Sequence, residues 1–145
     1  EIRHQAGKGR AAETAAAYAT AGVEAQVDEL IENMAGAYSW ADLVVCRSGA
    51  LTISELAAAG IGAILVPFPH AVDDHQTRNA EFLVDAGAAR LFPESGCTAL
   101  ELSRLVASLL SDRAVLVEMA KSARAVAMPD SARRVAAECM EYLDR

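Results

Sequence analysis

The chain of 145 residues lacks several features by which common protein classes are recognised. Its three cysteines, Cys46, Cys97 and Cys139, lie far apart and form no CxxC pair, so we expect reduced thiols rather than a disulfide framework. No apolar run approaches the roughly 20 residues of a membrane-spanning helix. Thirteen Lys and Arg against 20 Asp and Glu give a net charge of −7, which argues against a surface that binds nucleic acid.

The motifs of three large enzyme classes are also missing. The sequence contains no GxSxG, no P-loop and no GxGxxG, so it gives no support to a serine hydrolase, a P-loop NTPase or a Rossmann dehydrogenase. The sequence begins at Glu1 without Met or a signal-like segment, and its first residues have the pattern of a strand. We therefore expect it to be a piece of a longer protein.

Hydrophobic residues make up 53% of the chain. They are arranged in segments that have, in alternation, the length of a strand and the length of a helix. Strands are predicted at 2–6, 25–28, 42–46, 63–66 and 88–92. Helices are predicted at 11–21, 30–40, 51–59 and 75–86. Continuous apolar strands separated by helices are typical of a parallel sheet covered on both faces, so the fold class is α/β. Cys46, Tyr38, Trp40 and Phe92 are expected to serve packing.

The last third of the chain is predicted to be helical, because its apolar residues recur every three or four positions. These residues form three stripes: Leu102, Leu105, Val106, Leu109 and Leu110; Leu116, Met119, Ala120 and Ala123; and Val135, Ala136, Cys139 and Leu143. Pro129 separates the last two helices, with Asp130 or Ser131 as the N-cap. The chain is therefore expected to be one α/β unit with a helical C-terminal tail.

Two loops lead from buried strands into helices, which is where open α/β sheets bind ligands. In the first, 46–55, small residues at a helix start leave backbone N–H groups unpaired in front of the positive end of the helix dipole, which suits a phosphate. The small residues 49–50 would let a ligand approach the backbone closely. The alternative is ordinary capping of the helix, by Ser48 or by Thr52 in a capping box with Glu55.

The second loop, 67–76, ends in polar side chains around a helix start. His75 and Asn79 would lie one turn apart beside Gln76, and such a cluster can bind the hydroxyls of a sugar. One alternative is an N-cap at Asp74 with a solvated polar face. The other is a metal site, although the spacing matches no standard zinc pattern. Its ligands would be His70, Asp73 or Asp74, and His75.

Five segments carry a resemblance to a known family. They are His4-Gln5-Ala6-Gly7, Met34-Ala35-x-Ala37-Tyr38-x-Trp40-Ala41-Asp42, the run from Cys46 to Glu55, Pro67-Phe68-Pro69-His70 and Asp74-His75-Gln76-x-x-Asn79-Ala80. In order and spacing, the sequence resembles the MurG family, the bacterial UDP-N-acetylglucosamine transferases that make lipid II of peptidoglycan. The similarity spans nearly the whole chain, and the run 46–52 is its most specific part.

The resemblance implies the GT-B architecture, in which two Rossmann-like domains face each other across a cleft and the C-terminal one holds the donor nucleotide. Residues 1–145 resemble most of that donor-binding domain: a Rossmann-like parallel sheet with flanking helices and a helical C-terminal tail, incomplete at its N-terminus. The implied activity is an inverting transfer of N-acetylglucosamine from UDP-N-acetylglucosamine to lipid I. No metal or other cofactor is implied, because a helix N-terminus at 48–51 stabilises the departing UDP.

The resemblance also implies the donor contacts. They are Ile31 at the uracil, Ala50, Leu51, Thr52, Ile53 and Ser54 along the donor site, Glu55 at the ribose hydroxyls and Gln76 at the N-acetylglucosamine hydroxyls. Secondary contacts are Arg47, Ser48, Gly49, His75 and Asn79. We expect the acceptor domain, the catalytic base and a glycine-serine loop at the diphosphate to lie outside this sequence. No catalytic residue or metal ligand is therefore assigned, and the chain as given is expected to be inactive alone.

The implied partners are UDP-N-acetylglucosamine and, through the missing N-terminal domain, a lipid-linked acceptor, with no nucleic acid. The implied location is cytoplasmic, peripheral on the inner face of the bacterial plasma membrane. Two alternatives remain. One is a non-catalytic UDP-sugar-binding subunit of a two-chain glycosyltransferase. The other is a different GT-B enzyme such as a UDP-N-acetylglucosamine epimerase, for which Glu55 and the pair Asp73 and Asp74 offer few catalytic groups.

Overall fold

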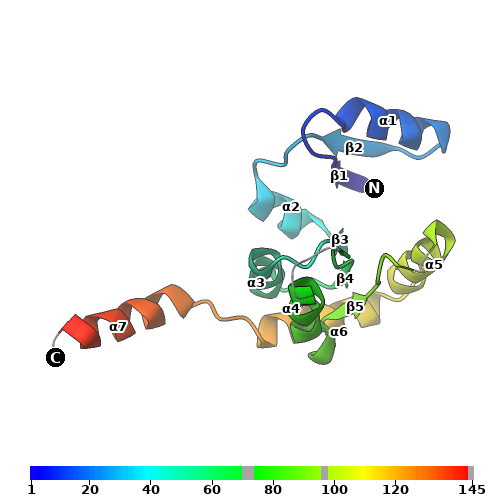
Figure 1. The fold of residues 1–145 in the computed structure, drawn as a ribbon. Coiled ribbons are helices and arrows are strands. Elements are labelled where there is room, and N and C mark those ends of the chain that lie inside the picture. Colours follow the sequence, from blue (N-terminus) through cyan, green and yellow to red (C-terminus); the bar gives the residue numbers. More distant parts are fainter. Residues whose placement is uncertain (70–73, 96–97, 144–145) are drawn as a thin grey trace. The chain divides into compact units, whose positions relative to one another are not determined.

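The computed structural model describes residues 1–69, 74–95 and 98–143, without the side chain of Leu143. The chain divides into two compact units, Glu1–Ala37 and Tyr38–Arg145, and each is described by itself (Figure 1). Within the described residues, none of the helices combines the length and the apolar character that crossing a bilayer requires.

The first unit is a strand–helix–strand arrangement. Strands β1 (Ile2–Gln5) and β2 (Ala25–Asp28) pair in parallel, and α1 (Ala11–Thr20) connects them and lies against β2 (Figure 1). A short helix, α2 (Met34–Trp40), follows and continues into the second unit. The two predicted strands and the first predicted helix are thus confirmed to within two residues at each end.

The start of α2 differs from the prediction of a helix over 30–40. The side chain of Asn33 accepts a hydrogen bond from the backbone N–H of Gly36 at 2.9 Å, so the helix begins only at Met34. A Cβ atom at Gly36 would lie 2.6 Å from Nδ2 of Asn33, so a larger residue there would displace the Asn33 side chain. The N–H of Ile31 donates to Oε1 of Gln5 at 2.9 Å and takes no part in the helix.

The second unit contains a three-stranded parallel sheet. Its elements are β3 (Val44–Cys46), α3 (Ala50–Ala59), β4 (Ala63–Leu65), α4 (His75–Asp85), β5 (Ala89–Leu91), α5 (Ala99–Leu110), α6 (Arg113–Ala125) and α7 (Ser131–Leu143). The strand order is β3-β4-β5, so β4 lies in the middle. Helix α3 ends where Gly60 adopts a left-handed conformation with a φ of 68°, as the sequence predicts.

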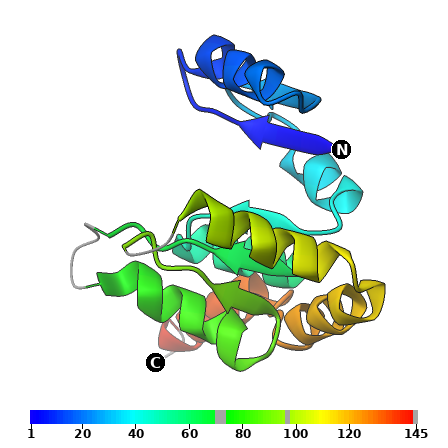
Figure 2. The ribbon, with the colours of Figure 1, turned by 90° about the vertical axis from the view of Figure 1, so that its right-hand side faces the viewer.

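Helices cover both faces of this sheet (Figures 1 and 2). All three residues of β4 are fully buried. Ala63 and Leu65 pack in a cluster with residues of α3 and α4, whereas Ile64 packs in a second cluster with residues of α5 and α6. Successive side chains of a strand point to opposite faces, so an unbroken apolar strand requires apolar cover on both sides. The predicted α/β class, with flanking helices, is therefore confirmed.

The helical tail is confirmed in its extent, but not all of its apolar stripes reach the core. Leu109, Leu116 and Met119, from the first two stripes, are buried. Leu110 is 53% exposed, because it lies about 100° around the helix from Leu109 and turns away from the sheet. The third stripe does not pack in the core, because every side chain of α7 from 131 to 142 is exposed. Periodicity alone shows that these residues share one side of a helix.

The two adjacent leucines of α5 provide a matched test of this packing. Leu109→Ala should lower the free energy of unfolding by about 2–4 kcal/mol, because it leaves a cavity beside Ile64 and Met119. Leu110→Ala should change it by less than about 1 kcal/mol, because the exposed side chain loses little burial. Urea unfolding followed by circular dichroism measures both values. Equal costs for the two variants would contradict the observed orientation of α5.

Candidate functional site

The two loops predicted to carry the site meet beside the carboxyl ends of β3 and β4. The hydroxyl of Ser48, in the first loop, donates a hydrogen bond to the backbone carbonyl of Gln76 at 2.7 Å. The side-chain amide of Asn79, one turn further along α4, donates to the backbone carbonyl of Ser48 at 3.1 Å. Ser48 has no exposed surface and is thus fixed from both its side chain and its main chain. These bonds set the position of the α3 start relative to the α4 start.

The start of α3 presents backbone N–H groups that have no partner among the described residues. Its N-cap is Gly49, whose carbonyl accepts the first helical hydrogen bond from the N–H of Ile53 at 3.0 Å. Across the described residues, no acceptor is recorded for the N–H groups of 49–52. With the positive end of the helix dipole behind them, these N–H groups suit an anion.

Capping by a side chain, the alternative for this loop, is wrong. The cap residue is Gly49, and no side chain in the described part of the chain accepts a hydrogen bond from the helix start. The Ser48 hydroxyl donates to α4, and the Glu55 carboxylate accepts from the hydroxyl of Tyr38 at 3.0 Å. The Ser48 hydroxyl and the Glu55 carboxylate therefore have partners elsewhere, and Thr52 lies inside α3 rather than at its N-cap, so none of the three caps the helix start.

The absence of a side chain at Gly49 has no structural cause within the described chain. Its φ of −64° is available to any residue. A Cβ atom there would meet only Oγ1 of Thr52, at 3.7 Å, which is an ordinary van der Waals contact. A glycine that neither backbone nor packing requires leaves room for close approach from outside.

Glu55 lies in the second turn of α3 with its side chain exposed. Its partner Tyr38 is partly buried against the core cluster of α3 and α4. Burial, and then the hydrogen bond and the charge of Glu55, raise the pKa of Tyr38 well above its usual range. The phenol therefore stays protonated at neutral pH and donates to the carboxylate. Tyr38 is absent from the predicted site residues, because a tyrosine at helical spacing is typical of packing.

Cys46 and Arg47, at the end of β3, have structural contacts. Burial raises the pKa of Cys46 to about 11, so it is a neutral thiol rather than a nucleophile, as expected for a core cysteine. The guanidinium of Arg47 donates to the carbonyls of Val66 and Pro67, at 3.3 and 3.1 Å, and to the carboxylate of Glu94 at 2.6 Å. Arg47 thereby ties the segment after β3 to those that follow β4 and β5.

Gln76 lies in the first turn of α4 and uses only the carbonyl oxygen of its side-chain amide in a hydrogen bond with the described residues. Its Oε1 accepts a hydrogen bond from the N–H of Phe68 at 3.0 Å, which directs the carbonyl half of the side chain toward the loop. Asp74 occupies the N-cap position, as one alternative expected, but its side chain accepts from the Thr77 hydroxyl at 2.7 Å and does not cap the helix. Gln76 therefore retains its NH₂ group as a donor for a ligand.

The structure describes only some of the residues that would be the ligands of a metal ion in the second loop. His70 and Asp73 lie outside the described residues. In the described part of the chain, no group of three His, Cys, Asp or Glu residues is placed to hold a metal ion. His75 is exposed at the first position of α4. The cysteines Cys46 and Cys139 are free thiols, whereas Cys97 falls outside the described residues.

The predicted donor residues of α3 divide by exposure. Ala50, Leu51, Ser54 and Glu55 are exposed, and Thr52 is half-buried. Ile53 is 5% exposed and packs in the core, so its role is to anchor α3 against the core. Ile31 belongs to the first unit, and its assignment stays a prediction.

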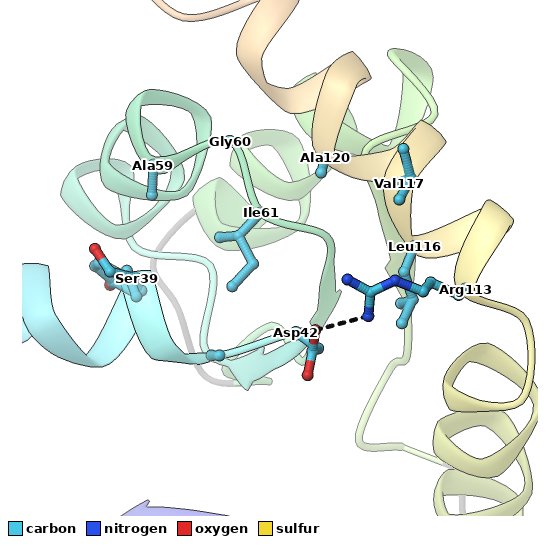
Figure 3. Close-up of a pocket in the computed structure, with 11 residues that line it drawn as sticks. Ser39, Asp42, Ala59, Gly60, Ile61, Arg113, Leu116, Val117 and Ala120 are labelled. Carbon is cyan, nitrogen blue, oxygen red and sulfur yellow. Dashed lines mark ion pairs between the residues drawn. The ribbon is translucent and has the colours of Figure 1, made fainter.

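A pocket of about 230 Å³ lies at the other end of α3, roughly 15 Å from the helix start by helical rise. Figure 3 shows Ile61 among the lining residues, with Asp42 and Arg113 paired along one side at 3.7 Å. Both charged side chains are largely exposed, so their ion pair contributes little to stability. None of the predicted donor residues lines this pocket, but Tyr38, whose hydroxyl donates to Glu55, does.

Comparison with known proteins gives consistent matches. A family model described as "Glycosyltransferase family 28 C-terminal domain" matches residues 1–135. A protein of Aeromonas hydrophila named UDP-N-acetylglucosamine–N-acetylmuramyl-(pentapeptide) pyrophosphoryl-undecaprenol N-acetylglucosamine transferase is 59% identical over 139 residues, 96% of this chain and 38% of that protein. A protein of the same name from Chromohalobacter salexigens is 58% identical over 97% of this chain and 38% of its own length.

A solved structure agrees with these matches. The crystal structure of Acinetobacter baumannii MurG is 48% identical and superposes with a TM-score of 0.86, over 92% of this chain and 39% of that chain. The chain thus spans about two fifths of the length of the curated relatives it matches.

The hydrogen bond from Asn79 to Ser48 can be tested by stability. Asn79→Ala should lower the free energy of unfolding by about 1–3 kcal/mol, because it removes the recorded partner of a carbonyl on a fully buried residue. The neighbouring Arg78→Ala is the control, since Arg78 is exposed, and it should change the value by less than about 0.5 kcal/mol. Urea unfolding measures both. If the two variants match, the Asn79 amide is not needed for the fold and is free to bind a ligand.

Proposed function

Because the chain belongs to the family of the glycosyltransferase family 28 C-terminal domain, we propose that it is the donor-binding part of an inverting glycosyltransferase. The donor is UDP-N-acetylglucosamine, the acceptor is lipid I, and the product is lipid II of peptidoglycan. The names of the similar proteins, which specify an N-acetylglucosamine transferase acting on a pyrophosphoryl-undecaprenol compound, support this choice.

The observation that carries the proposal is the open start of α3. The uncapped N–H groups of 49–52 form a fixed set of donors, and the exposed Glu55 lies one turn further along the same helix. The donor amide of Gln76 comes from the first turn of α4, where the Gln76 carbonyl accepts a hydrogen bond from Ser48. Together these groups match a diphosphate, a ribose and a sugar.

The chemistry assigned to this site is stabilisation of the leaving group. The 4-hydroxyl of the acceptor sugar attacks the anomeric carbon from the face opposite the diphosphate, and the bond from that carbon to the phosphate oxygen breaks. Negative charge then grows on UDP, where fixed N–H donors stabilise it without reorganisation. On this proposal no metal is needed. The proton of the attacking hydroxyl goes to a base that we assign to no residue of this chain.

The remaining contacts follow the chemistry of each donor group. Glu55, as a carboxylate, accepts from the ribose hydroxyls, and the NH₂ group of Gln76 donates to a hydroxyl of N-acetylglucosamine. Ala50, Leu51, Thr52, Ile53 and Ser54 form the helix along the donor. The protein works at the inner face of the bacterial plasma membrane, where a lipid-linked acceptor is found.

The identity of the donor can be tested by titration calorimetry with UDP-N-acetylglucosamine, UDP-glucose and ADP. We expect the first ligand to bind most tightly, because it alone presents uracil, a diphosphate and the N-acetyl sugar together. ADP, which shares only the diphosphate and the ribose, serves as the specificity control. Equal affinity for ADP and UDP-N-acetylglucosamine would contradict the proposed donor.

The role of Glu55 can be tested by substitution. Glu55→Ala should weaken UDP binding by about 5- to 150-fold, or about 1–3 kcal/mol, because it removes hydrogen bonds between the ribose and a charged group. Glu118→Ala is the control, since Glu118 is an exposed glutamate of α6 that pairs with Lys121. Calorimetry of UDP binding to each variant gives the comparison. If UDP binds Glu55→Ala as tightly as the unchanged protein, the ribose assignment fails.

A further inference from the structure

We propose that Tyr38 is a positioning residue for the ribose of the donor, because its hydroxyl holds the Glu55 carboxylate in the orientation that receives the two ribose hydroxyls. This inference rests on the proposed function of Glu55. It adds a second residue to the ribose contact, one that acts through the carboxylate rather than by touching the nucleotide.

Tyr38 and Glu55 form a hydrogen bond in which the donor is held by packing and the acceptor is not. Glu55 is exposed on α3, and an exposed glutamate side chain samples many rotamers, which must be lost when it binds a ligand. Tyr38 has a ring packed against the core cluster and only two side-chain torsions, so its hydroxyl is held in place. The 3.0 Å hydrogen bond between Tyr38 Oη and Glu55 Oε2 therefore selects one orientation of the carboxylate before any ligand arrives.

The bond leaves the carboxylate able to bind a diol. A carboxylate has two oxygens with about four acceptor positions, and Tyr38 occupies one position on Oε2. Oε1 and the second position on Oε2 remain for the neighbouring 2′- and 3′-hydroxyls of a ribose. Burial and the adjacent Glu55 raise the pKa of Tyr38, so the phenol remains a donor and never repels the carboxylate at neutral pH.

A purely structural role for Tyr38 would affect nucleotide affinity in a different way. If its hydroxyl merely held α2 against α3, its loss would weaken the binding of every nucleotide to a similar extent. A positioning role acts through the diol alone, so its loss affects only nucleotides that carry both hydroxyls. The two roles can therefore be separated by comparing UDP with 2′,3′-dideoxy-UDP.

The experiment measures the affinity of both nucleotides by calorimetry for the unchanged protein, Tyr38→Phe, Glu55→Gln, Glu55→Ala and the double variant of Tyr38→Phe with Glu55→Ala. We expect Tyr38→Phe to weaken UDP binding about 3- to 10-fold, the usual effect of one hydrogen bond, and to leave dideoxy-UDP binding unchanged. In the Glu55→Ala background, which removes the acceptor of the tyrosine hydroxyl, Tyr38→Phe should have no further effect on UDP, because the two residues act as one unit.

Tyr18→Phe is the matched control, since the Tyr18 hydroxyl also has a single recorded partner, His4, at 3.0 Å. It should change neither affinity. Thermal unfolding of each variant verifies that the fold is kept. Unchanged UDP affinity in Tyr38→Phe, or an equal loss for both nucleotides, overturns the positioning role while the Glu55→Gln result still supports the proposed function. If Glu55→Gln binds UDP normally, both the ribose assignment and the role of Tyr38 fail.

Discussion

Ser48 has no surface exposed to water, so its hydroxyl and its carbonyl must both find partners within the protein. Both partners belong to α4: the carbonyl of Gln76 and the amide of Asn79. A short side chain buried in this way cannot change its partners without moving a helix. The position of the α3 start relative to Gln76 therefore depends on this one serine, and so does the shape of any ligand site between the two loops.

The site also explains how an acidic chain can suit an anion. The net charge is −7, and Arg47, the cation nearest to the α3 start in sequence, is already paired with Glu94 and with backbone carbonyls. The positive potential comes instead from main-chain N–H groups at a helix start. Such groups carry no titratable proton in the physiological range. An overall negative charge therefore does not conflict with a diphosphate ligand, because the field that matters is local.

The sequence predicts those parts of the fold that depend on local pattern. The buried strand β4 and the stop at Gly60 follow from an unbroken apolar run and from a residue that tolerates positive φ. The convergence of the two loops follows from the rule that parallel strands end at one edge of a sheet. The family follows from motifs in order and spacing, and the match over residues 1–135 confirms it.

What the sequence misses depends on contacts between distant residues. Ser48 is 28 positions from Gln76, and Tyr38 is 17 positions from Glu55, so no local pattern reveals that these side chains meet. The exposed apolar face of α7 shows the same limit, because periodicity reports which residues share a face but not what covers it. The donors at the α3 start are main-chain atoms. Apart from proline, no single substitution at 49–52 deletes an N–H group, so a sequence change there can alter the space around these donors but not remove them.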